Sequence, residues 1–266
     1  MQRKLKFEDC LHARPRPKGM DVICTLQHFS IITYAVDPVR FEGLLPEQFA
    51  LDLVDIDGHP KALLSVVPFM DRYFSLAVLP RPRFEMGQTN YRLYIVDRKT
   101  GEKCVWFFGT TLDSWLICVP RYMWNLPWHP GNVHFTCEYD SSSGRYVRYE
   151  METQSRWAPA HVRLTQSQHE EGVMAGFPDR ETALVYLTHP LTGYYYRRDG
   201  QVGTYSVWHE RLAVTTGELL EAKFDLLSRC GWVTLPEQQS PHSVLIDPLN
   251  EFTVYLPPVL VKASST

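Results

Sequence analysis

Alternating apolar and polar residues run through most of the chain and predict a mostly β protein, because successive side chains of a strand point to opposite faces. Turn signals at Asp57-Gly58, Thr100-Gly101 and Ser143-Gly144 separate several of these segments and indicate antiparallel hairpins. We predict strands over residues 22–34, 49–57, 61–69, 90–97, 103–111, 132–140, 145–153, 161–166, 193–199 and 203–215. A closed or nearly closed barrel is the economical architecture for so many strands, because closure removes exposed edges.

Helices are predicted at a few places. Asp37 followed by Pro38 is the pairing of cap and first residue that begins a helix. Thr215 and Glu218 have the spacing of a capping box, and Gly231 supplies a stop, so a helix is expected over 215–231. Two further helices are predicted over 112–119, ended by Pro120, and over 179–187.

The first residues differ in character from the rest. Residues 13–19, ARPRPKG, predict a stiff extended connector, because each proline fixes its own φ and disfavours the helical region for the residue before it. We therefore expect a basic, proline-rich extension over 1–19, ordered structure from near Met20, and a single domain over 20–266.

Charge and composition exclude several classes of function. The net charge is −3 and the pI is near 6.4, so the clustered basic surface that binds nucleic acid is not expected. The longest apolar tract, ALLSVVPFMDRYFSLAVLP, is interrupted by Asp71 and Arg72 and is too short to predict a membrane span. The start of the chain lacks the apolar region of a signal peptide, so a cytoplasmic protein is expected.

The remaining motifs also narrow the choice. The six cysteines form no CxxC pair, which favours reduced thiols. The chain has no GxGxxG, GxxxxGK[ST], GxSxG or HExxH motif, so we predict no cofactor. His129, His134 and Cys137 lie close in sequence, but their spacing matches no zinc pattern and a fourth ligand is missing, so no metal site is predicted.

The order of segments resembles the acetoacetate decarboxylase superfamily, and in particular its uncharacterised YqjF-like branch. The similarity runs from about Met20 to Pro258 and rests on HFSIITYAVDPVRFEGLLPEQFALDLVDIDG, FEMGQTNYRLYI, WFFGTTLDSWLICVPRYMWNLPW and YSVWHERL. The resemblance implies a closed, cone-shaped, antiparallel β-barrel with a few flanking helices and a small ligand inside. It also makes a homo-oligomer plausible.

The family mechanism uses a lysine pair after a proline to form a Schiff base with a β-keto acid. Here Pro120 is followed by Arg121 and Tyr122, and no lysine occurs between Lys103 and Lys223. An arginine keeps its proton and cannot form the imine. The family's arginine ahead of the first strand is also replaced, since Leu26 falls there, which puts decarboxylation by the family mechanism in doubt.

Candidate site residues follow from this comparison. Arg121, with Tyr122 beside it, could hold an anion, or could form a structural ion pair. Glu85 matches the acidic residue of the family and could act as a general base, or could lie at the surface. Asn90 and Arg92 are two apart in a strand and share a face, which is either the inner face or an outer face with a salt bridge.

The last candidates are aromatic or basic side chains outside that strand. His209 could line the cavity or be a hydrogen-bonded structural histidine. Trp115, with Trp124 and Trp128, could wall an apolar pocket or belong to the core. Lys223 falls near the middle of the apolar face of the helix expected over 215–231, where a desolvated amine could form an imine. Alternatively, its stem covers apolar surface while its ammonium reaches water.

Three functions remain open on the sequence alone. The first is a barrel that binds a small anionic or apolar metabolite, with or without lysine-independent chemistry, in which Glu85, Arg92 and Arg121 converge on one cavity. The second is a Schiff-base decarboxylase or aldolase-like enzyme of keto acids with a relocated lysine. The third is a non-catalytic binding or assembly scaffold.

Overall fold

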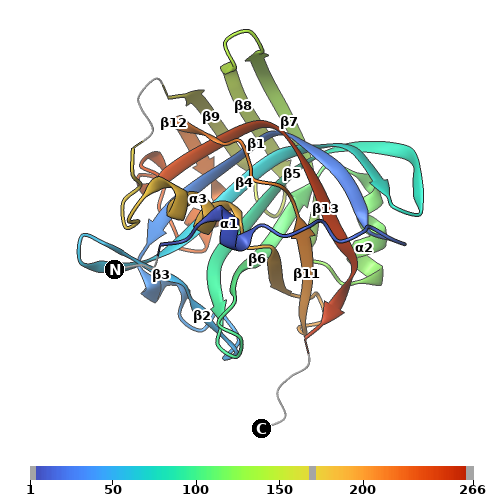
Figure 1. The fold of residues 1–266 in the computed structure, drawn as a ribbon, viewed down its shortest axis with the longest axis horizontal. Helices are drawn as coiled ribbons and strands as arrows, with labels where there is room; N and C mark the ends of the chain where they lie inside the picture. The colour runs from blue at the N-terminus through green and yellow to red at the C-terminus, as the bar shows by residue number, and fades with distance from the viewer. Residues whose placement is uncertain (1–3, 168–171, 262–266) are drawn as a thin grey trace.

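The protein has a mostly β, α+β fold, as the sequence predicts (Figure 1). Residues 4–167 and 172–261 are described by a computed structural model of the chain. The strands are β1 (Val22–Val36), β2 (Phe49–Leu51), β3 (Leu53–Ile56), β4 (His59–Leu76), β5 (Leu79–Asp97), β6 (Lys103–Leu112), β7 (Trp128–Asp140), β8 (Arg145–Ser155), β9 (Ala160–Gln166), β10 (Thr192–Tyr196), β11 (Val202–Trp208), β12 (Thr215–Phe224) and β13 (Ser243–Leu260).

The helical segments are short. They are α1 (Phe7–Cys10), η1 (Pro38–Phe41), η2 (Trp115–Ile117), α2 (Cys118–Met123), α3 (Arg180–Thr188), α4 (Asp225–Arg229) and η3 (Glu237–Gln239). The helix predicted over 179–187 is confirmed as α3, and Asp179 caps it by accepting from the Thr182 amide. Asp37 likewise caps η1. Across the described residues, no helix combines the length and the apolar character needed to span a bilayer.

The helix predicted over 215–231 is wrong for most of its length. Residues 215–224 form strand β12, and only Asp225–Arg229 is helical. β12 pairs antiparallel with β9 over seven registered residue pairs and with β13 over two. These long-range backbone hydrogen bonds override the local capping-box signal.

The helix predicted over 112–119 is confirmed for residues 115–119, but its predicted start and its predicted end at Pro120 are wrong. β6 continues to Leu112, and the helical residues begin only at Trp115. Pro120 is the third residue of α2, which runs on through Arg121 to Met123. A proline is tolerated in a first helical turn, because amides there have no intrahelical acceptor.

Ordered structure begins earlier than the predicted start near Met20. Phe7 in α1 is buried, and the Leu5 amide donates a hydrogen bond of 3.1 Å to Thr182 Oγ1 in α3. An apolar side chain within the basic segment therefore anchors it against the domain.

Hydrogen bonding joins the strands in the order β11-β10-β6-β7-β8-β9-β12-β13-β1-β4-β5-β2, with β3 paired to β4. Two additional pairings, β5 with β6 and β11 with β13, connect strands that are several places apart in this order. The predicted hairpins are confirmed, since β3–β4, β5–β6 and β7–β8 pair antiparallel. β6, however, pairs in parallel with both β7 and β10, so the sheet is mixed rather than antiparallel throughout.

The central strands contribute to two hydrophobic cores. Leu64 of β4 and Leu93 of β5 belong to one core, whereas Leu63 of β4 and Tyr94 of β5 belong to the other. This division follows from the alternation of side chains along each strand. The second core is covered by α3, and the cavity described next lies on this same side of the sheet.

Candidate functional site

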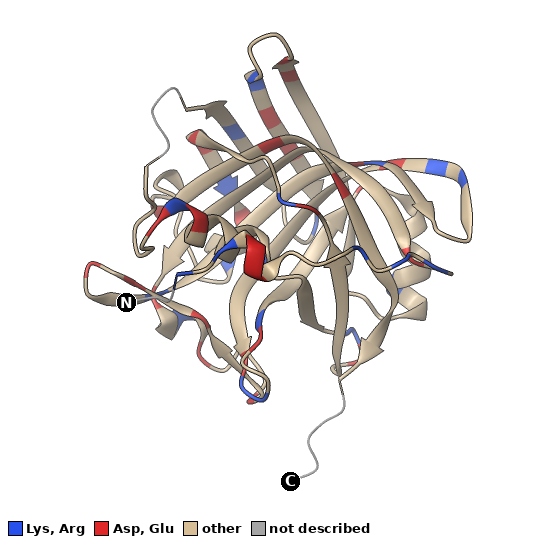
Figure 2. Ribbon diagram, viewed as in Figure 1, with Lys and Arg blue, Asp and Glu red and all other residues tan. Residues whose placement is uncertain are grey.

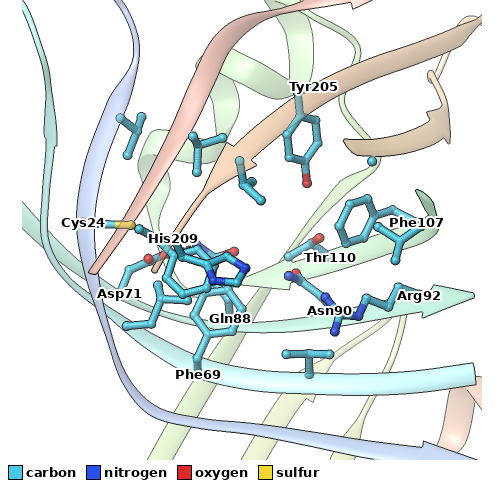
Figure 3. A pocket seen from close by; sticks show the side chains of 18 of the residues that line it. Cys24, Phe69, Asp71, Gln88, Asn90, Arg92, Phe107, Thr110, Tyr205 and His209 are labelled. Carbon is cyan, nitrogen blue, oxygen red and sulfur yellow. Dashed lines mark hydrogen bonds between the residues drawn. The ribbon is translucent and has the colours of Figure 1, made fainter. Parts of the chain in front are cut away.

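A cavity of about 120 Å³ is lined by residues of β1, β4, β5, β6, β10, β11 and β13 (Figure 3). Most of its lining is apolar and includes Val67, Phe69, Phe107, Leu126 and Phe252. An apolar cavity of roughly 150 Å³ accommodates a molecule as large as benzene. The cavity can therefore hold a small organic molecule.

Three polar side chains enter the cavity from β5. Gln88, Asn90 and Arg92 all line it, because they occupy alternate positions of one strand. Tyr91 and Leu93, which point to the other face of the strand, belong to the opposite core. Of the two alternatives for Asn90 and Arg92, an outer face with a salt bridge does not fit, because both residues line the cavity and none of the described acidic side chains pairs with Arg92.

Arg92 is held by main-chain and phenol oxygens rather than by a carboxylate. Its Nη2 donates to the main-chain oxygen of Leu187 at 2.8 Å and to the Tyr94 hydroxyl at 3.3 Å. Its Nε is buried and has no hydrogen-bond acceptor, and no acidic side chain within the described residues forms an ion pair with it. The guanidinium is therefore a cation without a counter-ion at the cavity wall.

Neutral polar groups surround this cation. Asn90 Oδ1 is buried without a hydrogen-bond donor, although the residue lines the cavity. Thr110 and Tyr205 line the cavity as well, and Figure 3 shows the Tyr205 hydroxyl on the side that holds Thr110 and Asn90. Burial raises the pKa of Tyr205, and the Arg92 charge opposes that rise, so the phenol remains neutral at pH 7.

A buried carboxylic acid, Asp71, lines the same cavity from β4. It is 2% exposed, and the Gln88 amide donates a hydrogen bond to its Oδ2. Burial raises the pKa of Asp71 to about 7, and a hydrogen bond from the Cys24 thiol opposes the rise. Asp71 was not among the site residues predicted from the sequence, although a charged residue inside the apolar tract 62–80 was a visible signal.

His209 also lines the cavity, just after the end of β11. Its Nδ1 lies 2.7 Å from the Glu210 main-chain oxygen, and its Nε2 lies 3.0 Å from that of Thr188. Burial lowers the pKa of His209 to about 4, so the ring is neutral at pH 7 and donates its one N–H to one of these oxygens. The main chain therefore fixes this histidine in the cavity wall.

The other candidates near the family motif lie outside the cavity. Glu85 is exposed and forms an ion pair of 3.2 Å with Arg72, at the end of the β4–β5 hairpin, where acidic and basic side chains mix (Figure 2). Arg121 donates to the main-chain oxygen of Trp128 and lines a separate surface groove. Tyr122 and Trp115 are 64% and 77% exposed. Glu85 and Arg121 therefore do not converge with Arg92 on one cavity.

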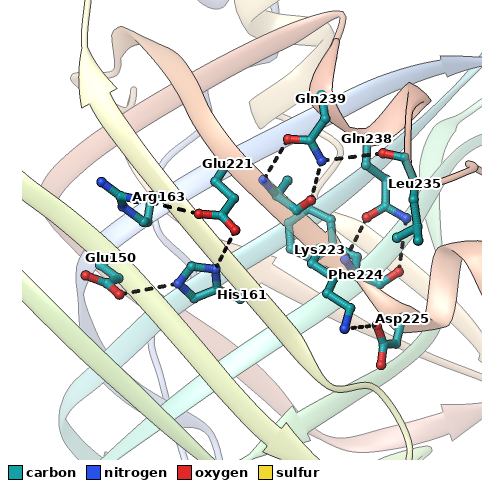
Figure 4. A network of polar contacts seen from close by, with 11 residues as sticks. Glu150, His161, Arg163, Glu221, Lys223, Phe224, Asp225, Leu235, Gln238 and Gln239 are labelled. Carbon is teal, nitrogen blue, oxygen red and sulfur yellow. Dashed lines mark hydrogen bonds and ion pairs between the residues drawn. The ribbon is translucent and has the colours of Figure 1, made fainter.

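Lys223 is not on a buried helical face, because residues 215–224 form a strand. Its side chain is 62% exposed, and its Nζ lies 3.7 Å from Asp225 Oδ1 (Figure 4). It lies near a surface network in which His161 contacts Glu150 and Glu221. None of the lysines that the structure describes lines the cavity.

The remaining histidine and tryptophan candidates do not lie together in one site. His129 stacks on Trp157 with ring centroids 4.0 Å apart, and in the described part of the chain no group of three His, Cys, Asp or Glu side chains is placed to hold a metal. Of the tryptophans considered as pocket walls, Trp128 lines the cavity, whereas Trp115 lies in the surface groove with Arg121.

Comparisons with solved structures define the class of fold. The chain is similar to the enduracididine biosynthesis enzyme MppR complexed with pyruvate, at 13% identity over 93% of this chain and 92% of that one, with a TM-score of 0.55. Acetoacetate decarboxylase from Legionella pneumophila subsp. pneumophila str. Philadelphia 1 matches at 14% identity over 98% of both chains (TM-score 0.54). An acetoacetate decarboxylase-like enzyme from Sphingomonas wittichii RW1 matches at 8% over 92% and 95% (TM-score 0.58).

These similarities show that the protein has the acetoacetate decarboxylase-like fold, as the resemblance in sequence implied. The sequence profile of DUF2071, described as an uncharacterized conserved protein, matches residues 24–249. The chain therefore belongs to the DUF2071 family. A comparison with curated proteins finds no match.

Proposed function

We propose that this protein binds a small carboxylate in the cavity, holds the carboxylate at Arg92, and forms no imine with its ligand. The observation that carries this proposal is the Arg92 guanidinium, which faces an apolar cavity without an acidic partner among the described residues. A partly buried cation without a counter-ion is unfavourable, and a carboxylate that accepts its N–H groups supplies the missing counter-ion.

The rest of the cavity suits an aliphatic or keto acid. Phe69, Phe107 and Leu126 offer apolar contacts to a short chain, and the Asn90 amide and Thr110 hydroxyl offer hydrogen bonds to a polar substituent. The similar structure of MppR is described as complexed with pyruvate, which is itself a small keto acid. Shared fold alone does not transfer that ligand, so the proposal relies on Arg92.

The absence of an imine follows from where the lysines lie. An imine-forming lysine must be neutral and must reach the ligand. Lys223 is exposed beside Asp225, and none of the described lysines lines the cavity. On the described residues, chemistry in this cavity would therefore be lysine-independent. The alternative of a Schiff-base enzyme with a relocated lysine is supported only by the similarity of fold. The alternative of a purely structural scaffold is disfavoured, because the cavity leaves room for a ligand.

We also infer that the strands close into the cone-shaped barrel implied by the resemblance. Two observations support closure, namely the pairing of β5 with β6 and the pairing of β11 with β13, which connect strands far apart in the order of the sheet. Such a barrel places the polar row of β5 inside, where Arg92 meets the ligand.

The first test is a calorimetric titration of pyruvate and hexanoate into three proteins: the wild type, Arg92→Gln and Arg121→Gln. Arg92→Gln should weaken binding about tenfold or more, which is the effect of losing one charge-assisted hydrogen bond. Arg121→Gln is the matched control and should leave the affinity within about twofold. Weakened binding in Arg121→Gln with unchanged binding in Arg92→Gln would contradict the proposal.

The second test is incubation with pyruvate and cyanoborohydride, followed by intact-mass measurement beside an acetoacetate decarboxylase that becomes labelled. No adduct is expected on this protein. A specific adduct at one site, located by peptide mapping, would contradict imine-free binding and would identify the lysine.

A further inference from the structure

The cavity has a second polar end, opposite Arg92. Asp71 lines it from β4, and Figure 3 shows Asp71 and Arg92 on opposite sides with Gln88 and Asn90 between them. The order along β5 explains this arrangement, because Gln88 binds Asp71 and Arg92 follows four residues later on the same face. The cavity therefore carries a basic group at one end and an acidic group at the other.

Asp71 has no cationic partner among residues 4–167 and 172–261. Its polar neighbours are the Gln88 amide and the Cys24 thiol, and neither carries a positive charge. Arg72 is adjacent in sequence, but its guanidinium pairs with Glu85. Arg14 lies close enough to lower the pKa of the Cys24 thiol, but it forms no ion pair with Asp71 among the described residues. Both charged groups of the cavity thus lack a counter-ion, and their signs are opposite.

The spacing of the two ends limits the length of a ligand. Four residues of an antiparallel strand span about 14 Å, so the main-chain positions of Gln88 and Arg92 lie about that far apart, and we take this length as the scale of the cavity between its two polar ends. A hydrogen bond of about 3 Å at each end leaves about 8 Å for the ligand. An extended chain advances about 3.5 Å in three bonds, so about six to eight chain atoms fill that length.

We propose that the ligand is an ω-amino acid whose carboxylate pairs with Arg92, whose ammonium pairs with Asp71, and whose aliphatic chain of about six to eight atoms crosses the apolar middle. This inference rests on the proposed function and adds the second end of the ligand. A molecule with one charge of each sign satisfies both unpaired groups, whereas a simple carboxylate leaves Asp71 unpaired. Phe69 and Phe107 supply the apolar contacts between the ends.

The experiment compares straight-chain ω-amino acids with hexanoate and 6-hydroxyhexanoate by calorimetry at about pH 8, where Asp71 is ionised. Affinity should be greatest near six to eight chain atoms, and 6-aminohexanoate should bind about tenfold more tightly than hexanoate. Asp71→Asn should bring this ratio close to one. Asp113→Asn removes an exposed carboxylate outside the cavity and should leave the ratio unchanged.

Equal affinities for 6-aminohexanoate and hexanoate would overturn the inference while the proposed function stands. Equal affinities for the amino and hydroxy acids would overturn the assignment of an ammonium. If none of these carboxylates binds, both the proposed function and this inference fail. A second measurement serves if Asp71→Asn does not fold. Near pH 6.5, binding of 6-aminohexanoate to the wild type should release protons from Asp71, and hexanoate should not, as measured in two buffers of different ionisation enthalpy. Equal proton release would also overturn the inference.

Discussion

Arg92 on β5 and Leu187 in the last turn of α3 are joined by a hydrogen bond of 2.8 Å from Nη2 to the main-chain oxygen. The Tyr94 hydroxyl donates to the same oxygen at 2.9 Å. The C-terminal carbonyls of a helix carry partial negative charge and attract cations, so α3 holds the guanidinium in place without neutralising it. The cavity can then present this cation to a ligand.

Tyr94→Phe should weaken both stability and carboxylate binding. The Tyr94 hydroxyl contacts Leu187, Ser65 and Arg92, and its loss leaves these buried partners with fewer hydrogen bonds. We expect unfolding free energy to fall by about 1–2 kcal/mol in urea titrations, and hexanoate affinity to fall a few-fold. Tyr195→Phe is the matched control, because the Tyr195 hydroxyl is buried without a partner and its removal should cost nothing. Equal losses in both variants would contradict this account of Arg92.

The buried carboxyl groups make stability depend on pH. Burial raises the pKa of Asp71 to about 7 and that of Asp247 to about 6, both above the value of about 3.9 expected for an unfolded chain. The folded state then binds more protons than the unfolded state, so these groups contribute stability at low pH that is lost as the pH rises toward 7.

Histidines act in the opposite direction. Burial lowers the pKa of His28, His129 and His209 to about 4, so their contribution is present above about pH 6.5 and is lost as the pH falls toward 4. Comparison with Asp71→Asn isolates the aspartate. Between about pH 4 and 8, the unfolding free energy of the wild type should decline relative to that of the variant by a few kcal/mol at most. A constant difference between the two urea-denaturation profiles would show that the pKa of Asp71 is not raised.

Local sequence patterns predicted those features that depend on neighbours in the chain. The period of two in NYRLYIVD put Asn90 and Arg92 on one face, and the helix expected over 179–187 is α3. β13 was not predicted, because Pro248, Pro257 and Pro258 interrupt its pattern. Its place in the sheet comes from pairing with β1, more than two hundred residues away.

The missed features of the site depend on contacts between distant segments. Thr215 and Glu218 carry a valid capping signal, but Thr215 pairs with Ile246 of β13, and Glu218 pairs with Thr165 of β9, about fifty residues earlier. Asp71 was visible only as a charge that broke an apolar tract. Its burial and its bond to Gln88 follow from the register of β4 against β5, which no local pattern specifies.

Lys223→Gln should have almost no effect. The ion pair with Asp225 is exposed, and exposed pairs contribute little because water and salt screen them. Unfolding free energy in urea should change by less than about 0.5 kcal/mol, and binding of hexanoate should be unchanged. A loss of binding in this variant would return Lys223 to the site and would revive the relocated-lysine enzyme.

Gly193→Ala should reduce the cavity. A Cβ at Gly193 would clash with Phe107 Cε2, and both residues line the cavity. The ring must therefore move or the strand must shift, since β10 and β6 are paired at this point. Overpacking of this kind costs about 1–3 kcal/mol, which urea denaturation can measure, and the affinity for the longer ω-amino acids should fall most. Gly172→Ala is the control, because a Cβ there meets nothing within 4 Å. If Gly193→Ala retains full stability and full affinity for the longest ligand, the Phe107 ring does not limit the cavity, and the ligand lies elsewhere along β5.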